Sequence, residues 1–356
     1  MLPAPVAGLF YLEVSMSPFP IRLPSSLWLL LALLSLTASA SGSLRQLHGE
    51  TMGTSYSIRW QQSTPHQGPA EVLHQVERQL QRVNRTLSVF RDDAEVVALN
   101  DSPVGQPIQV SEETARVLTI ARRIARESGG ALDITLGPVI EFWGFGAKPR
   151  DLSHKSLGQL ELVRSRTGMG GFRLEGRQFT KLIPGLEINP SAVAKGYGVD
   201  LIAEALTAMG IGDYLVEVGG ELRSQGSAPR GGPWQVAVTR PEKLSLEFQQ
   251  RVPLDNLAMA TSGNYVNLIR AQGVSLGHII DPRTGYPAAS GTLSVTVLHP
   301  SCAEADGYAT AMMVLTPDQA LALARDLDLA VMVVQAGPTG PVSRFSPAFR
   351  RIVAGH

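Results

Sequence analysis

Residues 302–313 (CAEADGYATAMM) constrain the fold of this chain most, because they form a largely apolar stretch with few polar side chains. We expect a helix here. Asp306 and Thr310 are four residues apart, so their oxygen atoms lie on the same helix face. Mg²⁺ prefers oxygen ligands and usually keeps waters and substrate phosphates as its other partners, so the pair is a candidate metal site. The alternative is a helix with two ordinary polar residues, in which Thr310 bonds back to the preceding turn.

The composition indicates a folded globular protein and excludes several classes of function. The chain has 356 residues, of which 44% are hydrophobic and 17% charged, and this suffices for a large core and two lobes. The formal net charge is zero, so we expect no nucleic acid partner and no long-range membrane-binding surface. Cys302 is the single cysteine, which excludes an internal disulfide and a cysteine-rich metal site. Because it lies in the apolar stretch, we expect a buried, inert thiol.

Residues 1–40 have the pattern of a secretory signal peptide. Arg22 precedes an apolar run at residues 27–34, and small residues suited to cleavage follow. Met16 gives a more ordinary start for such a signal than Met1 does. We therefore expect an exported, periplasmic protein. An uncleaved signal that anchors the chain in the inner membrane is the alternative.

The remaining sequence predicts a mixed α+β fold with a largely antiparallel sheet, flanking helices and two lobes. Predicted helices cover residues 72–87, 111–128, 195–209, 303–315 and 317–327. Predicted strands cover residues 47–60 (two strands around a turn), 172–179 (a hairpin), 214–218, 234–239, 265–269, 278–280, 293–298 and 330–334. Residues 131–146, rich in glycine and aromatic side chains, show little periodicity and predict an ordered loop. Residues 41–345 then form the main domain, with a boundary between lobes near 148–156, and residues 346–356 form a C-terminal tail.

Several glycine-rich segments are candidates for contact with a phosphate group. Residues 191–198 place Lys195 and small side chains where a helix begins, and the unpaired N–H groups of a helix start attract phosphate. Ordinary turns are the alternative for such segments. Residues 281–285 have the composition of a tight turn, and the neighbouring His278 is either a structural histidine or a catalyst. Residues 273–277 match the letters of a nucleophile elbow but lie between two predicted strands, so we expect a hairpin connection.

Eight short segments, taken together, resemble the FAD:protein FMN transferases, the ApbE-type flavin transferases. They are Thr51-Met52-Gly53-Thr54, Leu87-Ser88-Val89-Phe90, Ser128-Gly129-Gly130-Ala131-Leu132-Asp133, Ala194-Lys195-Gly196-Tyr197, Val218-Gly219-Gly220-Glu221, Thr261-Ser262-Gly263-Asn264-Tyr265, His278-Ile279-Ile280-Asp281-Pro282-Arg283-Thr284-Gly285 and Ala305-Asp306-Gly307-Tyr308-Ala309-Thr310. Each is weak by itself, but all eight occur in the order that the family has. The chain is therefore identified as a member of this family.

The resemblance implies an enzyme that splits the diphosphate of FAD with Mg²⁺ as cofactor. The FMN half is then attached through a phosphoester to a threonine or serine of a target protein, and AMP is released. The implied partners are FAD, bound between the two lobes, and acceptor proteins such as subunits of membrane redox complexes. A metal-dependent FAD pyrophosphatase that gives FMN and AMP is one alternative, and a non-catalytic FAD-binding protein is another.

Matching positions in the resemblance also imply a set of site residues. The implied metal ligands are Asp306, Thr310 and the backbone carbonyl of Ala192. The implied FAD contacts are Met52, Phe90, Ala131, Leu132, Asp133, Asn189, Lys195 and Ile279. Asn189 stands where many relatives have aspartate, and Phe90 stands where tyrosine is common. We expect these two departures to affect the affinity for the nucleotide and not the reaction itself.

A general base is desirable for this reaction, because the acceptor hydroxyl is a poor nucleophile. His278, which the resemblance places close to the flavin-phosphate end of FAD, is the first candidate. Asp306 is the second candidate, since a metal-bound carboxylate still accepts a proton.

Overall fold

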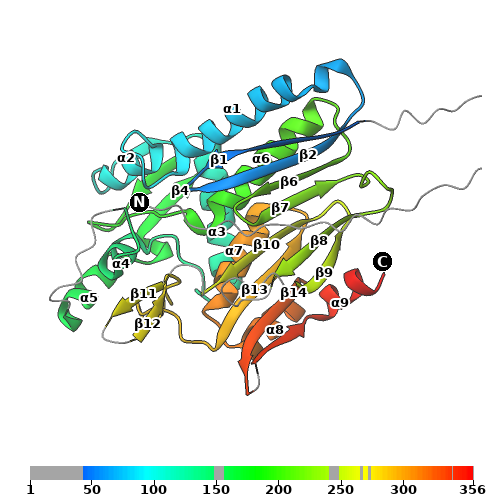
Figure 1. Ribbon diagram of the computed structural model, residues 1–356. Helices are drawn as coiled ribbons and strands as arrows, with labels where there is room; N and C mark the ends of the chain where they lie inside the picture. The colour runs from blue at the N-terminus through cyan, green and yellow to red at the C-terminus, as the bar shows by residue number, and fades with distance from the viewer. Residues whose placement is uncertain are drawn as a thin grey trace, which may run out of the picture.

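An eight-stranded antiparallel sheet forms the centre of the fold (Figure 1). The computed structural model describes residues 43–147, 156–239, 248–264, 268–271, 274–338 and 340–355. Within these ranges the strand order of the large sheet is β1-β2-β6-β7-β10-β13-β14-β15, and every neighbouring pair is antiparallel. Its strands are β1 (Ser43–Thr51), β2 (Thr54–Gln62), β6 (Tyr214–Val218), β7 (Glu221–Gln225), β10 (Ala258–Gly263), β13 (Thr292–His299), β14 (Ala330–Gly337) and β15 (Gly340–Phe345). The mixed α+β class with a largely antiparallel sheet is confirmed.

Smaller sheets and helices surround this sheet. The short strands are β3 (Pro107–Gln109), β4 (Phe172–Glu175) and β5 (Gln178–Lys181) in one sheet, β8 (Trp234–Thr239) with β9 (Phe248–Leu254), and β11 (Leu268–Ala271) with β12 (Val274–Gly277). The α-helices are α1 (Pro69–Leu87), α2 (Glu95–Asp101), α3 (Glu112–Glu127), α4 (Gly137–Trp143), α5 (Leu157–Arg164), α6 (Ser191–Ala208), α7 (Cys302–Met313), α8 (Pro317–Asp326) and α9 (Pro347–Ala354). Two 3₁₀ turns, η1 (Pro65–Gln67) and η2 (Met169–Gly171), complete the described elements.

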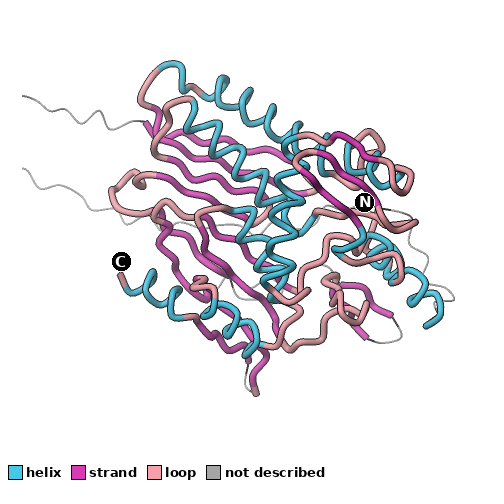
Figure 2. Tube along the Cα trace, turned by 180° about the vertical axis from the view of Figure 1, so that it is seen from behind, coloured by secondary structure: helices cyan, strands magenta, loops and turns pink. Residues whose placement is uncertain are grey.

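Both faces of the large sheet are buried. Helices α1, α3, α6, α7 and α8 cover one face, as the view from behind shows (Figure 2). The β8–β9 pair and α9 cover the other. Strand β14 shows how one sequence serves both layers, because Val331 and Val333 pack under the helices while Met332 and Val334 face the β8–β9 side. This two-sided burial explains the continuous apolar run that the sequence has there.

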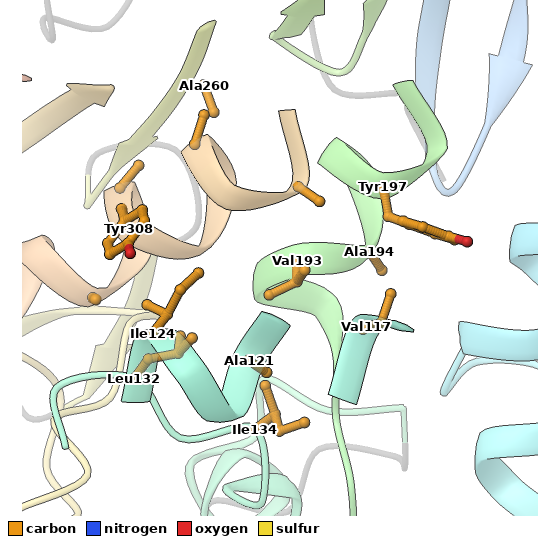
Figure 3. Packing of buried hydrophobic residues seen from close by; sticks show 14 of the residues in the cluster. Val117, Ala121, Ile124, Leu132, Ile134, Val193, Ala194, Tyr197, Ala260 and Tyr308 are labelled. Atoms are coloured by element: carbon orange, nitrogen blue, oxygen red, sulfur yellow. The ribbon is translucent and has the colours of Figure 1, made fainter. Parts of the chain in front are cut away.

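Helix α7 is surrounded by α3, α6, β10 and β13. Its small residues permit this close packing. A Cβ atom at Gly307 would lie 2.5 Å from Cδ1 of Ile124 in α3, and one at Gly196 of α6 would lie 2.3 Å from the carbonyl oxygen of Cys302. Figure 3 shows Ile124, Leu132 and Val193 filling the space beside α7. The apolar composition of residues 302–313 therefore reflects burial on nearly every side.

Most predicted elements are present, with shifted ends. Ser111 caps α3 by accepting a hydrogen bond from the Thr114 N–H at 3.2 Å, as its position before an apolar periodic stretch predicts. The turn between β1 and β2 is made by Met52 and Gly53, which have φ angles of 50° and 72°. Helix α6 begins at Ser191, one turn earlier than predicted, because Pro190 and the Asn189 side chain organise its first turn.

Three local predictions are wrong. The expected loop at 131–146 contains α4, whose start carries a proline and whose end is Gly144 in the left-handed conformation. The expected strand at 278–280 is an extended segment in which Ile280 makes only an isolated bridge with Pro287. The expected hairpin connection at 273–277 is largely strand β12 itself. Glycines and aromatic residues hide a short helix from periodicity, and short apolar runs do not distinguish a strand from an extended loop.

The C-terminal residues also differ from the expectation of a tail. Residues 347–354 form α9, which Ser346 caps by accepting a hydrogen bond from the Phe349 N–H at 3.2 Å. Phe349 is buried against β8, β9 and β14. The apolar residues of α9 follow helical spacing, so they form a face that packs on the sheet.

Two predictions lie wholly or largely outside the described residues. The signal peptide at 1–40 is one, and the boundary near 148–156 is the other, since only Ser156 of that segment is described. The start of the predicted strand at 265–269 is likewise undescribed, and its end falls in β11. In the described ranges no helix combines the length and the apolar content that a membrane span requires.

Candidate active site

Three charged side chains from separate elements meet beneath the large sheet. Lys195 lies in the second turn of α6, Asp306 in the second turn of α7, and Glu221 is the first residue of β7. The Lys195 Nζ donates a hydrogen bond to Glu221 Oε1 at 2.7 Å, and the Gly196 N–H donates one to Asp306 Oδ2 at 3.1 Å. Glu221 and Asp306 are only 2% and 3% exposed, so both carboxylates are removed from bulk water. We call these three residues the charged cluster.

The local backbone explains how the charged cluster forms. Gly196 lets α6 approach α7, because any side chain there would collide with the Cys302 carbonyl. Gly219 and Gly220 form the turn between β6 and β7 with φ angles of 59° and 101°, a region that favours glycine. That turn delivers Glu221 to the helix-covered face, and a Cβ atom at Gly219 would lie 2.7 Å from Cγ2 of Thr54. The glycines of both motifs are thus structural requirements of the cluster.

The electrostatics of the charged cluster are those of two carboxylates sharing one ammonium group. Burial raises the pKa of Asp306 to about 8, and the nearby charge of Glu221 adds to the rise while Lys195 opposes it. Burial also raises the pKa of Glu221. Burial acts to lower the pKa of Lys195, but the charges of Glu221 and Asp306 outweigh it, so the pKa is raised. Lys195 therefore stays protonated, and the charged cluster carries an uncompensated negative charge only when Asp306 has lost its proton.

The predicted metal ligands lie on the two central helices. The hydroxyl of Thr310 faces β10, where its Oγ1 lies 3.2 Å from Ser262 Oγ, so it pairs across to the sheet instead of with the preceding turn. Ala192 lies in the first turn of α6, close to where α6 packs against α7. The structure therefore brings the element that carries Asp306 and Thr310 against the element that carries Ala192.

These donors fit an oxygen-preferring cation. Within the described ranges, no group of three His, Cys, Asp or Glu side chains is placed to hold a metal ion. The candidate set is one carboxylate, one hydroxyl and one backbone carbonyl, which suits Mg²⁺ and leaves positions for water and substrate phosphate. Zinc and iron sites rely more on nitrogen and sulfur donors. A dication would also balance the charge of the Asp306 carboxylate once that group has lost its proton.

Lys195, one of the predicted FAD contacts, belongs to the charged cluster. The other predicted FAD contacts and the candidate base His278 fall into three groups. Ala131, Leu132 and Ile279 are buried in the hydrophobic core around α7, and Met52 packs against its edge. A Cβ atom at Gly198 of α6 would lie 3.0 Å from the Met52 Cε, which places the β1–β2 turn beside α6.

Asp133 and Asn189 form the second group, in neighbouring segments before α4 and α6. The Asn189 N–H donates to the Ile134 carbonyl at 2.6 Å, and its Oδ1 accepts hydrogen bonds from the N–H and hydroxyl of Ser191. Burial raises the pKa of Asp133, and hydrogen bonds from the N–H and hydroxyl of Thr135 oppose that rise. Asn189 thus organises the start of α6 without needing a charge, which an aspartate would add.

Phe90 and His278 form the third group. Phe90 follows α1 and is 67% exposed, and no contact in the described part of the chain joins it to the charged cluster. The ring of His278 lies edge-on to Phe145, with ring centroids 6.4 Å apart. His278 precedes the tight turn at 281–285, in which the Gly285 N–H donates to the Asp281 carbonyl at 2.8 Å, as the sequence predicts. The catalytic role of His278 stays a prediction.

Sequence reasoning gave no role to Glu221 or Asp200, although both support the site. Asp200 caps α7: its carboxylate accepts hydrogen bonds from the N–H groups of Cys302 and Ala303 at 2.9 and 3.0 Å. It also pairs with Arg223 of β7 at 2.5 Å. The available signal was a charged residue among the apolar and small residues at 196–203 of α6. The Cys302 thiol beside it is buried, and burial raises its pKa well above the ordinary value, in agreement with an inert thiol.

Solved structures of flavin transferases share this fold. The flavin transferase ApbE from Vibrio cholerae superposes with a TM-score of 0.81 and 35% sequence identity, over 87% of this chain and 100% of that one. The flavinyl transferase ApbE from Pseudomonas stutzeri, solved in an apo form, gives a TM-score of 0.81 and 31% identity, over 87% of this chain and 97% of that one.

Sequence comparison leads to the same family. The model of the ApbE family matches residues 52–333. The FAD:protein FMN transferase of Vibrio cholerae is 36% identical over 91% of this chain and 98% of its own length, and that of Haemophilus influenzae is 35% identical over 86% and 90%. The chain therefore belongs to the ApbE family.

Proposed function

We propose that this protein is an FAD:protein FMN transferase that uses Mg²⁺. It transfers the FMN half of FAD to the hydroxyl of a threonine or serine in a target protein. The hydroxyl oxygen forms a bond to the FMN phosphorus, the bond from that phosphorus to the bridging oxygen breaks, and AMP leaves. The curated relatives carry this activity in their names, which supports the proposal.

One structural observation carries the metal-dependent part of the proposal. Asp306 is a carboxylate buried in an apolar helix, with a hydroxyl one turn further on and an ammonium group close by. A bound Mg²⁺ supplies charge neutralisation at the diphosphate. The Lys195 ammonium group attracts phosphate oxygens, and burial under the sheet excludes water that would compete with the acceptor hydroxyl.

Each remaining residue has a narrower proposed role. Met52, Leu132 and Ile279 provide apolar contacts for the nucleotide, and the exposed ring of Phe90 offers a stacking surface. His278 is the first candidate to accept the proton of the acceptor hydroxyl, and Asp306 is the second. The N-terminal sequence supports export to the periplasm, where periplasmic domains of membrane redox complexes would be the acceptors.

The proposal is tested by asking whether AMP release requires an acceptor. The full chain is incubated with FAD and Mg²⁺, with or without a threonine-containing periplasmic domain of a membrane redox complex. We expect covalently bound flavin fluorescence on the acceptor, AMP in equal amount, and loss of both when a chelator removes the metal. AMP release at the same rate without acceptor would instead indicate a pyrophosphatase. FAD binding with no AMP over hours would indicate a carrier.

The acceptor and the compartment have their own test. Periplasmic and cytoplasmic proteins from cells with and without this gene are compared by mass spectrometry for an added FMN mass on threonine. We expect modified peptides only when the gene is present. Modified peptides confined to cytoplasmic proteins would contradict the proposed location.

A further inference from the structure

The ion pair between Lys195 and Glu221 lies close enough to Asp306 for both charges to act on its carboxyl group. All three groups act on one another electrostatically, yet in the described part of the chain Lys195 bonds to Glu221 and not to Asp306. The Lys195 side chain has four flexible methylene groups and is 36% exposed, so its position depends on its partner. Asp306 is the alternative partner for the same ammonium group.

Glu221, by contrast, is buried at the end of a tight turn. It follows the Gly219–Gly220 turn, pairs with Val218 across the hairpin and is 2% exposed. Its Oε1 accepts the hydrogen bond of Lys195, while its Oε2 has no hydrogen-bond partner among the described residues. A buried ion pair of this kind gives little net stability compared with apolar side chains of the same volume. Stability alone is therefore a poor explanation for a glutamate here.

We propose that Glu221 is a positioning residue that holds the Lys195 ammonium group away from Asp306. The Asp306 carboxylate then remains available to a divalent cation, and Lys195 remains beside the cation position as a second positive charge for phosphate. Without Glu221, Lys195 turns to Asp306 and competes with the cation for its oxygens. This inference rests on the proposed metal site of Asp306 and Thr310.

The test measures Mg²⁺ binding to the metal-free full chain by titration calorimetry, without FAD. The variants are E221Q, E221D, K195M and K195M/E221Q, and circular dichroism checks that each is folded. We expect E221Q to weaken Mg²⁺ binding on the order of tenfold or more, in the range of other residues that orient metal ligands. E221D keeps the charge but is one methylene group shorter, so it also loses several-fold in affinity. K195M/E221Q regains most of the wild-type affinity because the competing ammonium group is absent.

The E221D variant distinguishes a positioning role of Glu221 from an effect of its negative charge alone. If Glu221 acted only through its negative charge, E221D would bind Mg²⁺ as the wild type does, and that result would overturn the proposal. Unchanged affinity in E221Q would overturn it as well. E217Q is the matched control, since Glu217 lies in the same hairpin and accepts a hydrogen bond from the Gly220 N–H at 2.8 Å. It should stay within about twofold of wild type, as expected for a group outside the ligand shell.

Failure of the metal site itself is distinguishable. D306N should abolish Mg²⁺ binding if the proposed site is correct. A wild-type chain that binds no Mg²⁺, or a D306N variant that binds it normally, would refute the site and this inference together. If D306N loses Mg²⁺ binding but E221Q and E221D bind Mg²⁺ as the wild type does, the metal site stands and only the role of Glu221 is refuted. Should E221Q fail to fold, the comparison of E221D with E217Q still decides the question.

Discussion

The two buried faces of the large sheet contain different chemistry. The face under α6 and α7 holds Asp200, Glu221 and Asp306 among its apolar residues. On the face under β8, β9 and α9, the buried polar residues of the described ranges are uncharged, such as Ser224 and Thr296, and the rest is apolar. Buried charges are costly unless they are paired or bind a ligand. We therefore expect residues of the helix-covered face to serve function and residues of the opposite face to serve stability. Substitutions on the two faces should have separable effects.

The largest effect is expected from D306N on the helix-covered face. Asparagine keeps the shape of the side chain but removes the charge that a cation requires, so transfer of FMN should fall about a thousandfold, as for loss of a group that acts on transition-state charge. Rates are measured by AMP release and flavin fluorescence of the acceptor. D318N is the control, because Asp318 is an exposed residue of α8. Full transfer by D306N in excess Mg²⁺ would remove Asp306 from the site.

F349A on the opposite face should affect stability and leave the chemistry intact. Phe349 is 1% exposed, and its removal leaves a cavity that should cost about 3 kcal/mol of unfolding free energy. Chemical denaturation measures this loss, and the rate constant for transfer by the folded fraction should be unchanged. A large decrease in that rate constant, at a temperature where the variant is folded, would break the division between the two faces.

D200N should show that a charged residue on the functional face also has a structural role. Its carboxylate caps α7 and pairs with Arg223, so the substitution should cost about 2 kcal/mol of unfolding free energy. Because α7 carries Asp306 and Thr310, Mg²⁺ affinity should fall modestly as well. Denaturation and calorimetry measure the two quantities. A variant as stable as wild type would show that the cap contributes little.

The charge of Asp306 also predicts a pH dependence. In the folded, metal-free protein its pKa is raised to about 8 from an ordinary value of 3.8, so the folded state binds a proton that the unfolded chain has released. The resulting stabilisation of the folded state is complete below the pKa that Asp306 has in the unfolded chain. It is lost as the pH rises through about 8, the pKa in the folded state. The Tm of the metal-free protein should therefore fall between pH 6 and pH 9, and the gain in Tm on adding Mg²⁺ should grow.

Differential scanning fluorimetry with and without Mg²⁺ measures that change. D306N, which has no proton to lose at this position, should show a flatter profile and little gain from Mg²⁺. An equal gain in Tm for the wild type at both pH values would contradict the assigned charge state. The expected difference is a few degrees, since one pKa unit corresponds to about 1.4 kcal/mol.

The sequence predicts much of the fold, and particular residues show why it does not predict all of it. Helices α1 and α3 were found from apolar spacing and from the Ser111 cap, which are local signals. The sequence does not predict strand β7, because it begins with the charged residue Glu221. The burial of this residue depends on its ion pair with Lys195 of α6, which is distant in the sequence. Helix α4 was missed because glycines and aromatic residues mask its short period. Pairings between distant segments are tertiary information.

The candidate site divides in the same way. Asp306 and Thr310 were predicted from a spacing of four within one helix, which is a local relation. Ala192 came from the resemblance to the family, whereas Lys195 is also indicated by its place near a predicted helix start. The packing of α6 against α7 is consistent with the placement of both. The roles of Asp200 and Glu221 depend on partners about 100 and 26 positions away in the chain. A local pattern can mark Asp200 as an unusual charge, but it cannot show what either residue binds. The packing of the two helices created the site.

The most direct test of the metal site is a crystal structure of the full chain with FAD and Mn²⁺, which gives an anomalous signal in place of Mg²⁺. We expect an anomalous peak in contact with Asp306 and Thr310 and beside the diphosphate of FAD. If both side chains point away from the diphosphate and no peak lies near them, the proposed mechanism is wrong.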